Sequence, residues 1–233
     1  MNVLHEISTI RIKSRLGGVN CYLIETDAGF ILIDTGYSTS RNFLDRELEI
    51  EGCRPGNLKL VILTHGDIDH TGNCAYVHKK YGAPIAMHVG DMGMAGRGDM
   101  SYGRKPNIIL AMLLKRMPLL FGMISLFSDS SRYEGFRPDL ALDEGFDLTK
   151  YGLKASVIRL PGHSAGSIGI LTDEGDLFCG DLLTNMGKPE LNSIMDDRSA
   201  ASASVELLKG MNARTILPGH GDRFDAKTFL NSQ

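Results

Sequence analysis

The feature that most constrains this chain is a dense group of polar residues directly after the pattern of a buried strand. Residues 58–63 form a largely apolar run of strand length, which is typical of a strand covered on both faces. Four side chains that can bind metal ions follow within six positions, in the stretch His65-Gly66-Asp67-Ile68-Asp69-His70. A short loop at a strand end can turn alternate side chains toward one point. Imidazole together with carboxylate suits zinc, manganese or iron, so this stretch predicts a metal site.

More than one ion is expected there. Adjacent side chains such as Asp69 and His70 project in different directions, so a single ion could not easily use all four groups, whereas two nearby ions could. Three later segments also place a metal-binding residue beside glycine at a predicted strand end: Gly162-His163-Ser164, Gly180-Asp181 and Gly219-His220. A lone histidine at such a place is usually an ordinary loop residue, but the ordered set favours a metal centre. The remaining histidines, His5, His78 and His88, are expected to be ordinary surface or core residues.

The rest of the chain predicts an α/β fold. Strands are expected over 19–26, 30–34, 58–63, 84–88, 155–160, 167–172, 176–179 and 214–217, and helices over 38–51, 71–81, 199–210 and 225–230. The apolar set of the first helix is Phe43, Leu44, Leu48 and Ile50. Mixed strands with interspersed helices indicate sheet layers covered by helices. Residues 91–140 break this pattern, and we interpret them as a helical insertion or lid within a single domain, 1–233.

The ordered motifs resemble those of a known family. Asp34-Thr35-Gly36, His65-Gly66-Asp67-Ile68-Asp69-His70, Gly162-His163-Ser164, Gly180-Asp181 and Gly219-His220 are similar to the five motifs of the metallo-β-lactamase superfamily. The resemblance covers about residues 19–90 and 155–221 and leaves the insertion outside. It implies a metal-dependent hydrolase with an αββα four-layer sandwich, in which the metal site lies at one edge between the two sheets.

The resemblance also implies a role for each residue. His65, Asp67 and His163 would hold a first ion, while Asp69, His70 and His220 would hold a second. Asp181 would bridge both ions, and Asp34 would orient the ligand loop through hydrogen bonds. Asp69 is the candidate catalytic residue, expected to orient the nucleophile and to shuttle its proton.

One position departs from the family pattern. The usual motif HxHxDH has histidine where this chain has Asp67, which gives the variant HxDxDH. Three carboxylates and four imidazoles make a harder and more negative site, which favours manganese or iron relative to zinc, and all three metals stay open. Flavodiiron proteins of the same superfamily carry glutamate at this place and bind iron.

The predicted function is that of a dinuclear hydrolase. A metal-bridging hydroxide would cleave an ester, lactone, thioester or related bond of a small, partly apolar substrate. The alternative is a di-iron or mono-iron redox protein, flavodiiron-like or persulfide-dioxygenase-like. A nuclease ranks below both, because a net charge of -3 offers no basic field for a nucleic-acid partner. Lactonases of the superfamily often carry tyrosine three residues after the bridging aspartate, where this chain has Thr184, although Tyr102 or Tyr133 could supply a phenol instead.

The insertion and the termini complete the expectations. Segment 108–127 is rich in leucine, methionine and isoleucine, and it could form a lid over the cleft, bury against a second copy in a homodimer, or pack on the core. Basic residues and a proline interrupt it, so no membrane span is expected. The N-terminus lacks a signal-peptide pattern, which favours a cytoplasmic location. Basic residues of the insertion could bind a substrate carboxylate or phosphate, or form a solvated face: Arg97, Arg104, Lys105, Arg132 and Arg137. The four cysteines are expected to be buried or idle thiols.

Overall fold

Two six-stranded sheets pack face to face in the computed structural model, which describes residues 5–13, 18–104 and 132–230. The first sheet has the order β1-β2-β3-β4-β5-β6, with β1 to β3 antiparallel and β3 to β6 parallel. Its strands are β1 (Ile7–Ile12), β2 (Val19–Thr26), β3 (Gly29–Ile33), β4 (Leu58–Ile62), β5 (Ile85–His88) and β6 (Leu140–Leu142).

The second sheet comes from the other half of the chain. It has the order β12-β11-β9-β8-β7, and β10 pairs with the far end of β9. Its strands are β7 (Ala155–Arg159), β8 (Ile168–Thr172), β9 (Asp176–Asn185), β10 (Pro189–Leu191), β11 (Thr215–Gly221) and β12 (Phe224–Asp225). The strands β9 and β11 run parallel to each other at the centre of this sheet.

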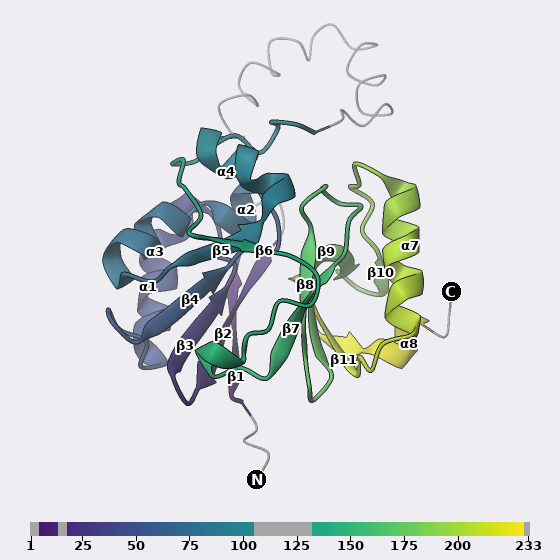
Figure 1. The fold of residues 1–233 in the computed structure, drawn as a ribbon, viewed down its shortest axis with the longest axis horizontal. Helices are drawn as coiled ribbons and strands as arrows, with labels where there is room; N and C mark the ends of the chain where they lie inside the picture. Colours follow the sequence, from purple (N-terminus) through teal and green to yellow (C-terminus); the bar gives the residue numbers. More distant parts are fainter. Residues whose placement is uncertain (1–4, 14–17, 105–131, 231–233) are drawn as a thin grey trace, which may run out of the picture.

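Helices cover the outer face of each sheet, so the molecule has four layers (Figure 1). The first sheet is covered by α1 (Arg41–Ile50) and α3 (Cys74–Tyr81), and the second by α7 (Arg198–Lys209) and α8 (Ala226–Leu230). Short helices complete the chain: η1 (Ser38–Ser40), α2 (Ile68–Thr71), η2 (Val89–Asp91), α4 (Met92–Arg97) and η4 (Thr149–Tyr151). The expected αββα sandwich is therefore confirmed.

Alternation along the strands explains the layers. On β2, Cys21 and Leu23 pack against the outer helices α1 and α3, while Tyr22 and Ile24 point into the layer between the sheets. On β9, Phe178 enters that same middle layer, whereas Leu177 packs under α7 and α8. Successive side chains of a strand point to opposite faces, so strands that are apolar at every position need a cover on both sides. Each fully buried leucine or isoleucine stabilises this arrangement by roughly 1.5–3 kcal/mol.

Helix α1 corrects one expectation about the core. Leu44 and Leu48, four residues apart, are almost completely buried and form its inward face. Phe43 and Ile50 were expected to join them but are 43% and 63% exposed. With 3.6 residues per turn, both lie about a quarter turn or more away from the Leu44–Leu48 line, so they face outward.

The insertion is described only in part. Its first section contains α4, and residues 132–140 lead back into β6. Residues 105–131, and with them the predicted lid or dimer segment 108–127, lie outside the described residues. The division into one domain with an insertion at 91–140 stays a prediction. Among the described residues, no helix has the length and apolar character needed to cross a membrane.

Candidate metal centre

The centre lies where the two sheets meet at one edge. Parallel strands β3 and β4 end side by side, and the chain continues from them into Asp34 and into the loop that begins at Leu63. That loop carries His65 and Asp67 and runs directly into α2, on which Asp69 and His70 lie. The second sheet contributes three further residues from three separate segments: His163 from the loop after β7, Asp181 from β9 and His220 from β11.

All seven predicted ligands converge. Three overlapping groups each bring their ligand atoms within 4.8 Å of one another: His65 with Asp67 and His163, His65 with His70 and Asp181, and Asp69 with His70 and His220. The closest pair joins His163 Nε2 to Asp67 Oδ2, at 3.0 Å. The first and third groups match the two ion positions that the sequence motifs imply.

Asp181 lies between these two positions. Its Oδ1 is 3.3 Å from His70 Nε2, and its Oδ2 is 3.3 Å from His220 Nε2 and 3.9 Å from His163 Nε2. One carboxylate therefore faces imidazoles of both groups. This is the placement expected of a bridging ligand.

Each of the four histidines has its Nδ1 occupied by another partner, which leaves Nε2 facing the centre. His163 Nδ1 is 2.7 Å from the carbonyl oxygen of Ile194, and His220 Nδ1 is 2.6 Å from that of Gly18. A carbonyl oxygen can only accept, so both Nδ1 atoms donate, and in the neutral ring Nε2 then keeps its lone pair. This second contact fixes the orientation of a histidine that binds a metal.

Asp34 provides the partner for the other two histidines. Its Oδ2 accepts from His70 Nδ1 at 2.8 Å and from Thr64 Oγ1 at 2.8 Å, while its Oδ1 accepts from the Thr64 backbone N–H. Because the Thr64 hydroxyl donates to Asp34, its oxygen accepts from His65 Nδ1, 2.9 Å away. Asp34 is also the one described non-glycine residue with positive φ, at 61°. The expected orienting contacts of Asp34 are therefore present, and they reach two ligands.

The donor atoms fit a pair of cations. The described part of the chain has few buried side-chain polar atoms without a hydrogen bond, and four of them belong to this cluster: His65 Nε2, His70 Nε2, Asp181 Oδ1 and Asp67 Oδ1, the last of which has only an ion-pair contact, with Arg104. Burying such atoms without a partner is costly, and bound ions would satisfy them. Gly219 keeps the space open, because a Cβ there would overlap Asp181 Oδ1 and lie 2.7 Å from His70 Cε1. The residues present thus suit the ions that the motifs imply.

The imidazoles and carboxylates of the centre shift the pKa values of one another. Burial lowers the pKa of His65 well below its usual range, and the neighbouring His70 and His163 lower it further, so this ring is neutral. Burial also lowers the pKa of His220, but the carboxylates of Asp181 and Asp69 outweigh it and raise the pKa to about 10. Burial raises the pKa of Asp69, yet His70 and His220 hold it below its usual value. The Asp69 carboxylate is therefore ionised at neutral pH.

Two ligands lie inside strands, contrary to expectation. The sequence pattern placed Asp181 at the end of a strand and His220 after one, but β9 continues to Asn185 and β11 to Gly221. The pairing of β9 with β11 is interrupted by register shifts on both sides of Pro218, and such bulges redirect side chains. The freed Pro218 carbonyl accepts hydrogen bonds from Tyr22 Oη at 2.7 Å and Asn20 Nδ2 at 3.0 Å, which joins the bulge to the opposite sheet.

Asp91 is a structural residue of the centre that the sequence did not single out. Its completely buried carboxylate accepts from the backbone N–H of Gly66 at 2.9 Å, the backbone N–H of Gly166 at 2.8 Å and the hydroxyl of Ser164 at 2.6 Å. It thereby joins the ligand loop of the first sheet to the loop that carries His163. An aspartate before a short helix resembles an ordinary cap, so no sequence signal distinguishes it.

Arg104 is the one insertion arginine that reaches the ligands within the described residues. Its Nη2 lies 2.8 Å from Asp67 Oδ1 and 3.3 Å from His163 Nε2. The sequence named it only among several cations that could bind a substrate anion. Lys105 lies outside the described residues.

The tyrosines and threonine named for lactone chemistry have structural contacts. Tyr133 Oη donates to the Gly66 carbonyl at 3.2 Å, and Tyr102 lies beneath the guanidinium of Arg97. Thr184 Oγ1 donates to the His220 carbonyl at 3.2 Å. His78 and His88 lie outside the three metal-binding groups, and all four cysteines are buried free thiols, as expected.

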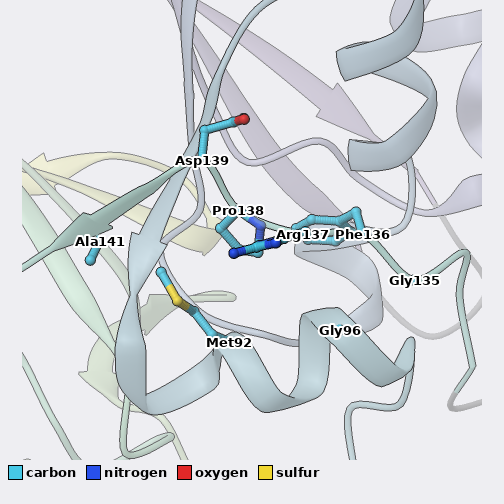
Figure 2. Close-up of a pocket in the computed structure, with 8 residues that line it drawn as sticks. All are labelled: Met92, Gly96, Gly135, Phe136, Arg137, Pro138, Asp139 and Ala141. Atoms are coloured by element: carbon cyan, nitrogen blue, oxygen red, sulfur yellow. The ribbon is translucent and has the colours of Figure 1, made fainter.

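A separate hollow of about 710 Å³ lies between α4 and the segment that leads into β6 (Figure 2). Its lining residues are Met92, Gly96, Gly135, Phe136, Arg137, Pro138, Asp139 and Ala141. None of the seven clustered ligands lines it, so this hollow is distinct from the metal centre.

Curated proteins are similar to this chain in sequence. "Probable metallo-hydrolase YflN" of Bacillus subtilis is 25% identical over 90% of this chain and 83% of its own length. "Hydroxyacylglutathione hydrolase GloC" of Haemophilus influenzae is 25% identical over 87% of this chain and 85% of its own. "Beta-lactamase-like protein 2 homolog" of Caenorhabditis elegans is 24% identical over 90% of this chain, which spans 58% of that longer relative.

Solved structures agree on the fold. A metallo-beta-lactamase family protein from Thermus thermophilus superposes with a TM-score of 0.72 at 24% identity, over 97% of this chain and 77% of the other. An archaeal superfamily protein from Sulfolobus tokodaii gives 0.67 at 19% identity, over 99% and 85%. The model of the metallo-beta-lactamase superfamily matches residues 14–220, and the chain therefore belongs to this superfamily of metal-dependent hydrolases.

Proposed function

We propose that this protein is a dinuclear hydrolase that cleaves an ester, lactone, thioester or related bond of a small, partly apolar substrate. The observation that carries the proposal is the convergence of two three-residue ligand groups around Asp181. His65, Asp67 and His163 would hold one ion, and Asp69, His70 and His220 the other. The donor set of four imidazoles and three carboxylates suits zinc, manganese or iron.

Bound divalent ions would supply Lewis acidity, which polarises the target oxygen and lowers the pKa of a water molecule toward about 7. The chain's own residues would do the rest. Asp181 and the four imidazoles would hold the two cations. Asp69 is the most accessible of the three carboxylates, with 18% of its side chain exposed against 10% for Asp67 and 7% for Asp181.

Asp69 is therefore the carboxylate best placed to meet a water molecule and a substrate. Its Oδ2 is 3.3 Å from His220 Nε2, and its pKa is held low, so it is ionised and can accept a hydrogen bond at neutral pH. We assign to it the orientation of the attacking water and the acceptance of its proton. General-base contributions of this kind are typically 10²–10⁴-fold. The name of the Haemophilus relative, a hydroxyacylglutathione hydrolase, supports including acyl-thiol bonds in the substrate class.

The test starts from the purified protein and its metal content. We expect about two metal ions per chain by elemental analysis, and turnover of at least one member of a panel of aryl ester, lactone, thioester and phosphodiester substrates. Chelator treatment should abolish turnover, and added zinc, manganese or iron should restore it. A protein that holds two ions and cleaves no member of the panel would contradict the hydrolase proposal.

Asp69→Asn tests the assigned proton acceptor. Asp173→Asn is the matched control, because the Asp173 side chain is exposed and the residue contacts Lys154 through its backbone N–H. Asp69→Asn should lower kcat by 10²–10⁴-fold while the control keeps parental turnover. Full activity of Asp69→Asn at full metal content would refute the role.

A redox function is the second candidate, and Asp67 is the observation that favours it. A hard carboxylate oxygen in the first ligand group suits iron. Iron-loaded protein that consumes oxygen, shows visible absorption bands and fails to hydrolyse the panel would select this alternative.

A further inference from the structure

A guanidinium group lies against the first ligand group. Arg104 follows the turn after α4, and 12% of its side chain is exposed. Its Nη2 is 2.8 Å from Asp67 Oδ1 and 3.3 Å from His163 Nε2, and its Nε is 3.4 Å from Asp196 Oδ2. One cation of the chain itself thus contacts two of the three residues that would hold the first metal ion.

Arg104 lies beside the nitrogen of His163 that would face a metal ion. His163 Nδ1 donates to the Ile194 carbonyl, and Nε2 lies 3.0 Å from Asp67 Oδ2 and 3.3 Å from Arg104 Nη2. Guanidinium is always protonated in proteins and has no acceptor, so it cannot bind a metal ion and can only compete with one for Asp67. The same guanidinium neutralises the charge of Asp67. It would also repel a metal ion held by Asp67 and His163, because both carry positive charge.

The second ligand group has no such competitor. In the stretches that the structure describes, Asp69 and Asp181 form ion pairs with histidines alone, and no lysine or arginine contacts them. The two metal positions therefore differ beyond their ligands, because a permanent cation, Arg104, lies at only one of them.

Arg104 also has a second anion to bind. Asp196 Oδ2 is 3.4 Å from Nε, and the Asp196 side chain is 22% exposed. A shift of the planar group toward Asp196 would release Asp67 and His163 without leaving the arginine unpaired.

We propose that Arg104 makes the two metal positions unequal: the Asp69, His70 and His220 position binds a divalent cation first, and the His65, Asp67 and His163 position binds one only when Arg104 withdraws toward Asp196. The inference rests on the proposed pair of metal positions. It assigns Arg104 a positioning role in metal loading, and it predicts stepwise binding.

Metal binding by the chelator-treated full chain tests this inference. Zinc and manganese are titrated separately, with dissociation constants from calorimetry and from competition with a chromophoric chelator, and with stoichiometry from native mass spectrometry. The parent protein should bind two ions in steps at least tenfold apart. Arg104→Ala should tighten the weaker step by about 10- to 100-fold, the range seen for contacts to metal ligands, and should leave the stronger step within twofold.

Three further variants identify the step and control for charge. Arg104→Lys keeps a positive charge and should retain most of the difference in affinity between the two binding steps. Arg97→Ala removes an exposed cation of α4 that stacks on Tyr102, and should leave both steps unchanged. Asp67→Asn should selectively weaken the second step, in the parent and in the Arg104→Ala background alike. Circular dichroism and melting temperature establish that each variant is folded.

The outcomes are separable. Arg104→Ala isotherms that superimpose on the parental ones, or that show a weaker second step, would overturn the inference, and the latter result would make Arg104 a support of Asp67 instead. Tightened binding in a protein that hydrolyses nothing leaves the inference standing and refutes the hydrolase. Turnover together with two equal metal affinities would support the hydrolase and overturn the inference about Arg104.

Discussion

Replacing Asp34 by asparagine should remove the hydrogen bonds that hold His70 and, through Thr64, His65 in orientation. Asparagine keeps the shape of the side chain and tolerates the positive φ of 61° at this position. One amide oxygen can still accept from the Thr64 backbone N–H. The amide nitrogen, however, then faces two donors, His70 Nδ1 and Thr64 Oγ1, which both donate to Asp34 Oδ2 in the native protein.

The magnitude follows from these contacts. Two buried hydrogen bonds to a charged acceptor are lost, at about 1.5–3 kcal/mol each, so the metal-free protein should lose roughly 3–6 kcal/mol of unfolding free energy. Without its acceptor, His70 can move its proton from Nδ1 to Nε2, the atom that faces Asp181. Affinity for the metal held by His70 should therefore fall about 10- to 100-fold.

Urea denaturation of the chelator-treated protein measures the first effect, and competition with a chromophoric chelator measures the second. Asp173→Asn makes the same chemical change at an exposed site and should alter neither. Comparing Asp34→Ala with Asp34→Gly isolates the backbone strain of the positive φ at position 34. The glycine variant should be more stable than the alanine variant by about 1–2 kcal/mol. Parental metal affinity in a folded Asp34→Asn protein would refute the proposed orienting role.

Two further predictions concern packing and the thiols. Gly219→Ala should cost roughly 1–3 kcal/mol of stability and weaken metal binding at least tenfold, because the added methyl would overlap Asp181 Oδ1. Gly210→Ala is the control: its methyl would make only an ordinary contact at 3.6 Å, so a metal titration should match that of the parent. Burial raises the pKa of Cys53 and Cys179 to about 12, and those of Cys21 and Cys74 also lie well above the usual value. An aromatic disulfide reagent at pH 8 should therefore modify none of the four thiols until denaturant is added, and rapid labelling of the folded chain would contradict this.

The ligand loop could be predicted from sequence because its information is local. A buried strand, a short loop and four ligand side chains within six residues leave few arrangements for His65 to His70. Most of the longer strands and the outer helices follow from periodicity in the same way. Local patterns also placed the boundaries of β2 correctly, since a turn of Asp27, Ala28 and Gly29 marks its end.

Features that depend on distant partners could not be read from the sequence. The apolar pattern of β9 fades at Cys179, but pairing with β11 and β10 carries the strand onward to Asn185. The bulge at Pro218 depends on Tyr22 and Asn20, nearly two hundred residues away. Arg104 resembles any basic residue of an insertion, and only the folded chain brings it to Asp67.

The division of ligands between the two sheets has a consequence for how long the protein survives. Each ion position would connect residues of the first half, such as Asp67 or His70, to one residue of the second half, His163 or His220. A bound cation would then act as a removable cross-link that closes a loop of about 100–150 residues, which for a permanent cross-link lowers the entropy of the unfolded chain by an equivalent of roughly 4–5 kcal/mol. All four cysteines lie within the described residues, and none of them forms a disulfide that could replace this tether. Scarcity of the metal would therefore expose the protein to proteolysis, so that its abundance in the cell would follow the supply of the ion.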